Sequence, residues 1–340
     1  MSTTLVACVA ENMRQWFHEV QDLALSLRHL GGPLAEAPFV ACFVEAVEPE
    51  FREGLAALGA EVRVVDRFDP RNPPSNKLRM LELAETHEFD RLLMIDTDTV
   101  VVGDVGSYAP ADRIAAKPEN SDPFPVETWQ GLFAALEIPE PAQSVRMTTT
   151  GEVTYPYYNT GVVLVPRDSC LALGEAWGRR VHELLELYES HPETVAKPQR
   201  HWTNQTAFAL AVIGLGVEVT PLPVAANLST TVRVHRSLRH TVRPPYVLHY
   251  HNEMDASGFL LRSRNRQLNP TLDAVNRLRS EVLGLAYDGM AEAPLVKRAL
   301  RRVEGHAWYE RGPVATVRRH RLLAPVRRQA KRLAGARPGA

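Results

Sequence analysis

Two carboxylates separated by one residue, Asp96 and Asp98, follow directly after an apolar run at residues 92–95. The run predicts a buried strand, and residues two apart on a strand point to the same side. Carboxylate oxygens are the ligands that Mg²⁺ and Mn²⁺ prefer, and these ions usually share them with phosphate oxygens. The pattern therefore indicates a divalent-metal site, and a pair of solvated turn aspartates is the alternative interpretation.

The elements that must position these carboxylates alternate between strand-like and helix-like patterns over the first hundred residues. We expect strands at residues 4–10, 39–44, 62–65 and 92–95, and helices at residues 13–30, 49–58 and 76–87. Asn76 is the expected cap of the last helix. This order predicts an α/β protein with a doubly wound, mixed and mostly parallel sheet, which binds ligands outside the carboxyl ends of its strands.

The pattern changes after Asp98. Short strands are expected at residues 100–102, 113–116, 160–165, 217–222 and 246–250, and helices at residues 171–188 and 203–213. Residues 117–157 are rich in Pro, Thr and Ser and weakly periodic, which predicts a long functional loop. We expect this loop to shape the site of a second substrate.

Several classes of protein are disfavoured by what the sequence lacks. The residues after the first strand, 9–13, contain no glycine, which argues against a dinucleotide-binding fold or a phosphate-binding P-loop. The three cysteines stand far apart, as reduced thiols do, and predict neither a disulfide framework nor a zinc site. We find no signal peptide and no apolar run long enough to span a bilayer, so a cytoplasmic location is expected.

Four segments together resemble glycosyltransferase family 8, the glycogenin and lipopolysaccharide galactosyltransferase family with the GT-A fold. Residues 89–101 resemble its Asp-x-Asp segment, and residues 158–164, 202–208 and 247–250 resemble three later segments in the family's order. The resemblance covers roughly residues 4–260. It implies a metal-dependent hexosyltransferase that moves a sugar from a nucleotide-diphosphate sugar, with UDP favoured, to an unidentified acceptor. A glycan, a lipid-linked saccharide, a small molecule or a protein would each suit as acceptor.

The resemblance also implies the metal ligands. By matched position, Asp96, Asp98 and His249 would bind Mn²⁺ (or Mg²⁺) on the diphosphate of the donor, and Thr97, between the two aspartates, would be a further donor-binding residue. A neutral imidazole can complete a mostly oxygen site, and His251 or His240 is the alternative to His249.

Donor contacts implied by the resemblance lie at the ends of the first strand and the third helix. Ala10, Glu11 and Asn12 would hold the base and ribose, and Lys77 would lie near the diphosphate. The alternative roles are helix-start capping for Glu11 and Asn12 and an exposed helix position for Lys77.

Three amides are the implied catalytic residues: Asn159, Asn204 and Gln205. Asn204 stands where the family has an aspartate, so this chain lacks a negative charge expected beside the reacting sugar. We therefore expect retention of anomeric configuration by front-face attack, with Gln205 positioning the sugar. The family's late lysine is missing, and Arg262 or Arg264 is the candidate replacement. A metal-dependent nucleotidyltransferase or phosphohydrolase and a catalytically silent sugar-binding relative are the alternatives.

The carboxyl-terminal segment differs sharply in charge from the rest. Residues 291–340 contain 13 Lys and Arg against three acids, a net charge of +10, whereas residues 1–290 carry −11. The division predicts a glycosyltransferase domain at 1–290 and a basic amphipathic tail at 291–340. Arginines interleaved with Leu and Trp favour an anionic membrane surface, at the inner face of the membrane, over a solvated tail. No motif supports binding of nucleic acid.

Overall fold

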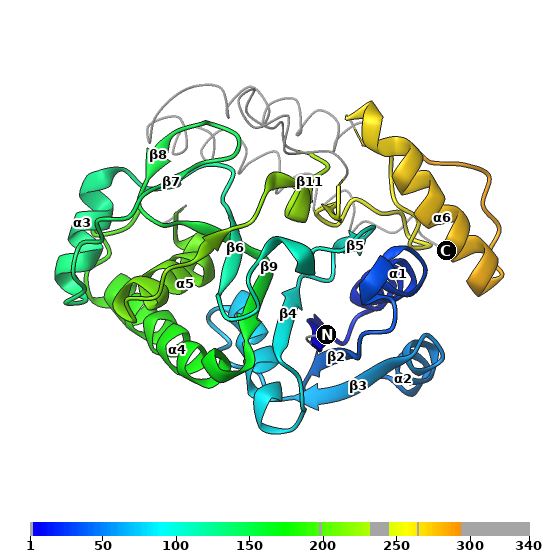
Figure 1. Ribbon diagram of the computed structural model, residues 1–340, viewed down its shortest axis with the longest axis horizontal. Coiled ribbons are helices and arrows are strands. Elements are labelled where there is room, and N and C mark those ends of the chain that lie inside the picture. The colour runs from blue at the N-terminus through cyan, green and yellow to red at the C-terminus, as the bar shows by residue number, and fades with distance from the viewer. Residues whose placement is uncertain (1–2, 197–198, 232–244, 264, 294–340) are drawn as a thin grey trace, which may run out of the picture.

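The computed structural model describes residues 3–196, 199–231, 245–263 and 265–293 (Figure 1). Its centre is a seven-stranded sheet in the order β10-β6-β9-β4-β1-β2-β3. The strands are β1 (Thr4–Glu11), β2 (Phe39–Val44), β3 (Ala60–Val65), β4 (Arg91–Ile95), β6 (Ala115–Pro118), β9 (Tyr158–Pro166) and β10 (Thr220–Pro221). The predicted α/β class with a mixed sheet is confirmed.

The antiparallel direction of β9 determines which of its residues lie at the carboxyl edge of the sheet. β1 pairs in parallel with β2 and β4, whereas β9 runs antiparallel between β4 and β6. Ile95 at the end of β4 pairs with Val162 in the middle of β9, and Pro118 at the end of β6 pairs with Tyr158 at the start of β9. The first half of β9 therefore lies beside the end of β6 and beside the segment that follows β4. The chain also reverses its strand order between β1 and β4, which is where open α/β sheets bind ligands.

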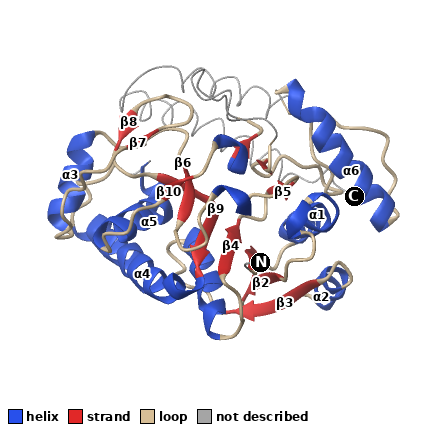
Figure 2. Ribbon diagram, in the orientation of Figure 1, coloured by secondary structure: helices blue, strands red, loops and turns tan. Residues whose placement is uncertain are grey.

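Helices cover both faces of the sheet (Figure 2), and alternating side chains of the strands fill two apolar cores, one on each face. In β1, Leu5 and Ala7 face one core while Val6 and Cys8 face the other. The α-helices are α1 (Arg14–Leu30), α2 (Pro49–Ala56), α3 (Val126–Ala135), α4 (Arg167–Ser190), α5 (Thr203–Gly214) and α6 (Asn269–Leu283). α1 and α2 cover one face and α3, α4 and α5 the other. Burial on both faces explains why β2 is apolar throughout and why β4 is apolar after Arg91.

A second, smaller sheet extends the carboxyl edge. It has the order β11-β12-β5 and comprises β5 (Thr99–Val101), β11 (Leu228–Ser229) and β12 (Val247–His249). β5 follows β4 after three residues and pairs antiparallel with β12, so that Thr99 lies opposite His249. This pairing brings a residue 150 positions away in the chain to the end of β4. A further two-stranded ribbon joins β7 (Val145–Arg146) and β8 (Val153–Thr154).

The third predicted helix forms with a different geometry. It is a 3-10 helix, η2 (Pro73–Glu85), that begins before Asn76 rather than at it. Asn76 is not a cap: its amide oxygen accepts from the Phe68 N–H at 2.9 Å and its amide nitrogen donates to Glu11 at 3.1 Å. Pro73 and Pro74 occupy the first turn, where a missing N–H costs nothing, and so set the earlier start. The described residues form five other short 3-10 helices: η1 (Gly32–Leu34), η3 (Gly106–Tyr108), η4 (Gln199–Trp202), η5 (Val224–Asn227) and η7 (Arg266–Leu268).

The prediction of one long loop at residues 117–157 was wrong. The segment contains the end of β6, the helix α3 and the β7-β8 ribbon. Trp129 of α3 is fully buried against Phe124 and Tyr157, and its indole N–H donates to Asp122 at 2.8 Å. Aromatic packing rather than periodicity orders this segment, so its weak hydrophobic pattern concealed it. The strand expected at 217–222 is likewise reduced to the two residues of β10.

α6 was not predicted from the sequence. It packs on α1 through Arg279, whose guanidinium lies 2.6 Å from Asp22, and both side chains are buried. Residues 294–340 of the predicted basic tail lie outside the described residues. His240 and Arg264 also lie outside them. Within the described part of the chain, no helix is long and apolar enough to cross a membrane.

Candidate active site

The Asp96–Asp98 segment is held from both sides by main-chain hydrogen bonds. The Asp96 N–H donates to the Gly161 carbonyl of β9 at 2.8 Å, and the Tyr250 N–H donates to the Asp98 carbonyl at 2.9 Å. One neighbour belongs to the large sheet and the other follows β12 of the small sheet. The two carboxylates therefore emerge where the two sheets meet.

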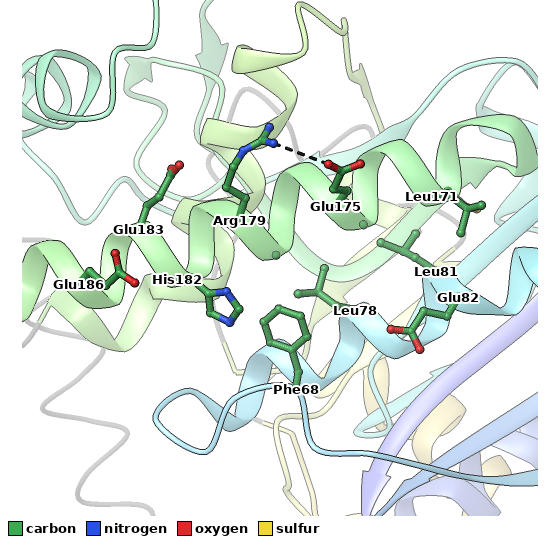
Figure 3. Close-up of a pocket in the computed structure, with 13 residues that line it drawn as sticks. Phe68, Leu78, Leu81, Glu82, Leu171, Glu175, Arg179, His182, Glu183 and Glu186 are labelled. Carbon is green, nitrogen blue, oxygen red and sulfur yellow. Dashed lines mark ion pairs between the residues drawn. The ribbon is translucent and has the colours of Figure 1, made fainter.

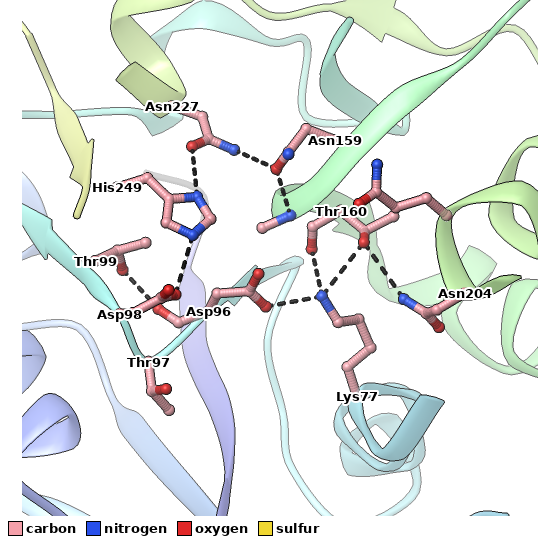
Figure 4. A network of polar contacts seen from close by, with 12 residues as sticks. Lys77, Asp96, Thr97, Asp98, Thr99, Asn159, Thr160, Asn204, Asn227 and His249 are labelled. Carbon is pink, nitrogen blue, oxygen red and sulfur yellow. Dashed lines mark hydrogen bonds and ion pairs between the residues drawn. The ribbon is translucent and has the colours of Figure 1, made fainter. Parts of the chain in front are cut away.

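Asp98 and His249 form the closest pair of candidate metal ligands (Figure 4). Asp98 Oδ1 lies 3.0 Å from His249 Nε2, and both side chains are largely buried. Burial by itself would raise the pKa of Asp98, but the His249 ring more than offsets it and lowers that pKa to about 2. Burial by itself would lower the pKa of His249, and Asp98 more than reverses this so that the pKa is raised. Each side chain thus favours the charged state of the other.

Asp96 faces Lys77 rather than His249. Lys77 Nζ lies 2.7 Å from Asp96 Oδ1 and 3.0 Å from the Thr160 carbonyl, and the lysine is 7% exposed. The alternative of an exposed helix lysine is therefore wrong, and the ammonium group lies at the carboxyl edge. Asp96 is held by a cation, whereas Asp98 is held by an imidazole that can bind a metal.

His251 lies close enough to belong to the same centre. Its ring stacks on His249 with centroids 4.0 Å apart, and ligand atoms of Asp98, His249 and His251 all lie within 4.8 Å of one another. His251 and Asn252 both have left-handed backbones, with φ of 52° and 58°. Strain of this kind in a non-glycine residue concentrates at functional sites. The turn folds His251 back over His249, an arrangement that spacing alone did not reveal.

Gly161 leaves room for these side chains to converge. A Cβ at this position would lie 2.8 Å from Asn159 Oδ1, 2.9 Å from His249 Cε1 and 3.0 Å from Asp96 Oδ2. Side chains of β9, β12 and the segment after β4 thus approach one point from three directions. Only glycine fits there without displacing them.

The predicted catalytic amides gather around a carboxylate that the sequence analysis missed. Glu119, directly after β6, accepts from Asn159 Nδ2 at 2.6 Å and from Gln205 Nε2 at 2.8 Å. Asn204 donates to Thr160 Oγ1 at 3.4 Å, and its buried amide oxygen has no hydrogen-bond partner among the described residues. The pairing of β6 with β9 was the missing signal, because it alone brings Glu119 to Asn159.

The residues expected to hold the base and ribose lie at the end of β1. Glu11 receives two hydrogen bonds from Arg67, each of 2.9 Å, and Asn12 Oδ1 accepts from the Glu48 N–H at 3.1 Å. Ala10 is buried in the core, so it can offer a ligand little beyond its backbone. α1 starts at Arg14 without a side-chain cap, so the alternative role of Glu11 and Asn12 as caps does not hold. Arg67 was not predicted as part of this region.

Thr97 points away from the candidate metal ligands. Its hydroxyl donates to Glu19 of α1 at 2.6 Å, and both residues are buried. Burial first, and the charge of Asp98 second, raises the pKa of Glu19 to about 7. The Thr97 side chain therefore anchors the turn to α1 (Figure 4), and the assignment of Thr97 to the donor site stays a prediction.

Replacement of Glu19 by Gln is expected to stabilise the chain increasingly as the pH rises. The pKa of Glu19 in the folded chain, about 7, lies above the value of about 4.3 for an unfolded Glu. The contribution of Glu19 to stability is thus fully present below about pH 4.3 and is lost as the pH rises through about 7. The melting temperature of Glu19→Gln minus that of the unmodified chain should therefore increase between about pH 5 and pH 8. A difference that stays constant over this range in scanning calorimetry contradicts the assignment.

A separate groove of ≈ 520 Å³ lies between η2 and α4, on the face of the sheet covered by α4 (Figure 3). Phe68, Leu78 and Leu81 form its apolar floor, and the Glu175–Arg179 ion pair of 3.9 Å lies along its rim. None of the predicted site residues lines it. The groove is thus distinct from the carboxyl edge, where the candidate ligands converge.

Three solved structures show a distant likeness to the chain. The bifunctional glycosyltransferase WbbM gives a TM-score of 0.47 at 14% identity over 74% of this chain, and GlyE of Streptococcus pneumoniae TIGR4 gives 0.45 at 13% over 84%. Mouse xyloside xylosyltransferase 1 gives 0.41 at 14% identity, with 74% of this chain and 97% of that chain covered. The chain spans 46% of the WbbM chain and 64% of the GlyE chain. No curated protein matches the sequence.

The sheet and the cluster at its carboxyl edge define a doubly wound α/β protein with a candidate centre for a divalent metal. Its family follows from the sequence. The chain belongs to the Rhodobacterales glycosyltransferase domain family, which matches residues 6–216. This range includes Asp96, Asp98, Asn159 and Gln205 but ends before His249. Sugar transfer is therefore the general activity of its family, while the more specific membership of glycosyltransferase family 8 stays a prediction.

Proposed function

We propose that the chain is a metal-dependent hexosyltransferase of GT-A type that moves a sugar from a nucleotide-diphosphate sugar, with UDP favoured, to an acceptor. The observation that carries the proposal is the buried pair of Asp98 and His249, 3.0 Å apart at the carboxyl edge. Asp96 and Lys77 lie beside it and the amide cluster of Asn159 and Gln205 lies beyond. The diphosphate would thus meet charged side chains, and the sugar would meet neutral amides next to them.

The residues present fit Mn²⁺ or Mg²⁺. Asp98 offers a carboxylate and His249 an imidazole nitrogen at one point, with Asp96 on one side and His251 on the other. Carboxylates suit both ions, whereas an imidazole favours Mn²⁺ over Mg²⁺. Once bound, the ion would supply Lewis-acid stabilisation of the negative charge on the departing diphosphate. Lys77, whose ammonium group is held next to Asp96, would bind the same diphosphate as a second cation.

The amide cluster is proposed to bind and orient the sugar. The buried Asn204 oxygen is an acceptor without a partner among the described residues, and burying such an atom costs free energy unless a ligand satisfies it. A sugar hydroxyl is a donor that suits it. Gln205 and Asn159 both donate hydrogen bonds to Glu119, which holds them in place, and they would orient the sugar.

We further propose that transfer retains the anomeric configuration. The Glu119 carboxylate accepts three hydrogen bonds, from Asn159, from Gln205 and from the Asn120 N–H at 2.7 Å, so its oxygens are engaged as acceptors. Such engagement suits an orienting group better than the nucleophile of a double displacement. Attack on the face that the diphosphate leaves, with the diphosphate taking the acceptor proton, needs no carboxylate nucleophile. NMR of the anomeric centre in the first product decides, and an inverted centre refutes retention.

A panel of nucleotide sugars with added Mn²⁺ tests the function itself. We expect slow metal-dependent release of a nucleoside diphosphate and a free sugar from at least one donor, since water can replace the acceptor. Release of a nucleoside monophosphate instead supports a phosphohydrolase, a class that the family membership disfavours. Metal-dependent binding without turnover, even with acceptors added, supports a silent sugar-binding relative. Absence of metal-dependent nucleotide binding refutes the proposal.

The division at residue 290 and the partner of the basic tail are also proposals. Residues 1–290 carry a net charge of −11 and the tail +10, and the tail interleaves its arginines with apolar residues. We propose that the tail docks on an anionic membrane surface at the cytoplasmic face, where each basic residue contributes about 1 kcal/mol. Flotation with anionic liposomes should recover the full chain but not a chain truncated after Met290. Equal recovery of both contradicts the proposal.

A further inference from the structure

We propose that Asn227 is a positioning residue for the metal centre. It is the link in a chain of hydrogen bonds that runs from Glu119 through Asn159 to His249 and determines which ring nitrogen of His249 faces the ion. The inference rests on the proposed function, because it concerns the ion of that same site. Neither the sequence pattern nor the family resemblance pointed to Asn227.

The contacts form an unbroken series, of which Figure 4 shows the part from Asn159 to His249. His249 Nδ1 lies 3.2 Å from Asn227 Oδ1, and Asn227 Nδ2 lies 2.8 Å from Asn159 Oδ1. Asn159 Nδ2 in turn lies 2.6 Å from Glu119 Oε2. Asn227 ends η5, directly before the small sheet, whereas Asn159 lies in β9 of the large sheet and Glu119 directly follows β6. The series therefore crosses from the sugar side of the site to the metal side.

A backbone group fixes the direction of this series. The Gly161 N–H, which can only donate, lies 2.8 Å from the same Asn159 Oδ1, so this atom must be the amide oxygen. The Asn159 amide nitrogen then faces Glu119, a carboxylate that can only accept. Two independent neighbours thus agree on the orientation of Asn159, which coordinates alone leave open for an amide.

The orientation of Asn159 determines that of Asn227 and the tautomer of His249. Because Asn159 presents an oxygen, Asn227 must present its NH₂ group to it and its own oxygen to His249. His249 Nδ1 must then carry a hydrogen. Without an ion, Nε2 carries a second hydrogen and donates it to Asp98, and an ion that binds Nε2 displaces only that second proton. Nε2 is the atom that lies 3.0 Å from Asp98 Oδ1, where an ion would bind. The series therefore selects the tautomer that can bind metal.

Burial makes this selection strict. Asn227 is 2% exposed and His249 is 6% exposed, so water has little access to replace a lost partner. Outer partners of metal-binding histidines fix the orientation and tautomer of the ring, and their loss typically weakens metal affinity by about 10–100-fold. We expect Asn227 to act in this way without touching either the ion or the donor.

The first test measures Mn²⁺ affinity by electron paramagnetic resonance in the absence of any donor. Asn227→Leu, which is similar in size and cannot accept, should weaken Mn²⁺ binding by about 10–100-fold. Asn227→Asp keeps the acceptor for His249 Nδ1 and loses the donor to Asn159 Oδ1, so it should bind Mn²⁺ more tightly than Asn227→Leu. Asn269→Leu, which removes an amide that accepts from the Ser263 N–H away from the site, is the matched control and should leave affinity unchanged. In turnover, Asn227→Leu should raise the apparent KM for Mn²⁺ more than it lowers kcat at saturating metal.

A second measurement keeps the proposal testable even if Asn227→Leu does not fold. In the unmodified chain labelled with ¹⁵N-histidine and saturated with diamagnetic Mg²⁺, Nδ1 of His249 should be the protonated nitrogen and Nε2 the nitrogen without a hydrogen. The opposite tautomer, or unchanged Mn²⁺ affinity in a folded Asn227→Leu chain, overturns the role of Asn227 and leaves the proposed function intact. Failure of the unmodified chain to bind Mn²⁺ would instead refute the proposed function together with this inference.

Discussion

Asp98→Asn is expected to lose Mn²⁺ binding and metal-dependent donor binding while keeping its fold. The change removes the charge that lies 3.0 Å from His249 and leaves an amide of nearly the same size. Because loss of an outer partner already weakens metal affinity by about 10–100-fold, loss of a ligand should cost more than about 100-fold. A thermal-shift titration with Mn²⁺ and UDP measures both effects at once. The stabilisation by ligand seen in the unmodified chain should disappear.

Asp112→Asn is the matched control for this experiment. Asp112 is exposed and lies in a turn before β6, so its neutralisation changes the net charge equally without touching the site. The control should bind Mn²⁺ and UDP as the unmodified chain does. If Asp98→Asn retains metal-dependent binding, the centre at the carboxyl edge is not the metal site, and the proposed function loses the observation that carries it.

Gly161→Ala is expected to damage the same centre by geometry alone. The added Cβ would lie 2.8–3.0 Å from atoms of Asn159, His249 and Asp96, which is closer than carbon packs against any of them. All three side chains, or β9 itself, would have to move. Displacement of reacting groups by about 1 Å can cost about 100-fold in rate, so we expect a loss of turnover of that order. Donor hydrolysis at saturating Mn²⁺ measures it.

Gly131→Ala is the control that shows whether the loss of turnover comes from the change at the candidate active site. Gly131 lies in α3, and a Cβ there would meet nothing within 4 Å. Alanine in a helix interior is favoured over glycine by about 1 kcal/mol, so this variant should melt slightly higher and keep its turnover. Normal turnover by a folded Gly161→Ala chain would mean that the three side chains do not act together in the reaction.

The strands of the first half and the carboxylates that follow β4 could be predicted because their signals are local. An apolar run of strand length needs no partner to be recognised, and a parallel sheet places its ligands at the carboxyl edge whatever the loops contain. The order of the four motifs then brought His249 to Asp98, and the structure places these two side chains in contact.

Glu119 and Asn227 could not be predicted, because their importance comes from pairing between distant segments. Glu119 follows an ordinary short strand, and it matters only because β9 runs antiparallel beside β6. Asn227 ends a short 3-10 helix, and it matters only because β12 returns to β5. Neither position carries a periodic or compositional signal. The order of residues 117–157 could not be predicted for a related reason. Its buried aromatic contacts join α3 to residues on both sides of it in the chain, so no single stretch of sequence shows them.

The two main-chain hydrogen bonds that hold the Asp96–Asp98 segment have a thermodynamic consequence. The Gly161 carbonyl and the Tyr250 N–H fix the backbone that carries both carboxylates, so the conformational entropy of organising them is lost when the chain folds rather than when the ion arrives. Affinity for the ion then depends on two strands, β9 inside the family's matched range and β12 beyond it. A fragment that stops at residue 216 would keep the hydrogen bond to Gly161 but lose the one from Tyr250. The ion would then have to order the backbone at Asp98 when it binds, which would lower its affinity.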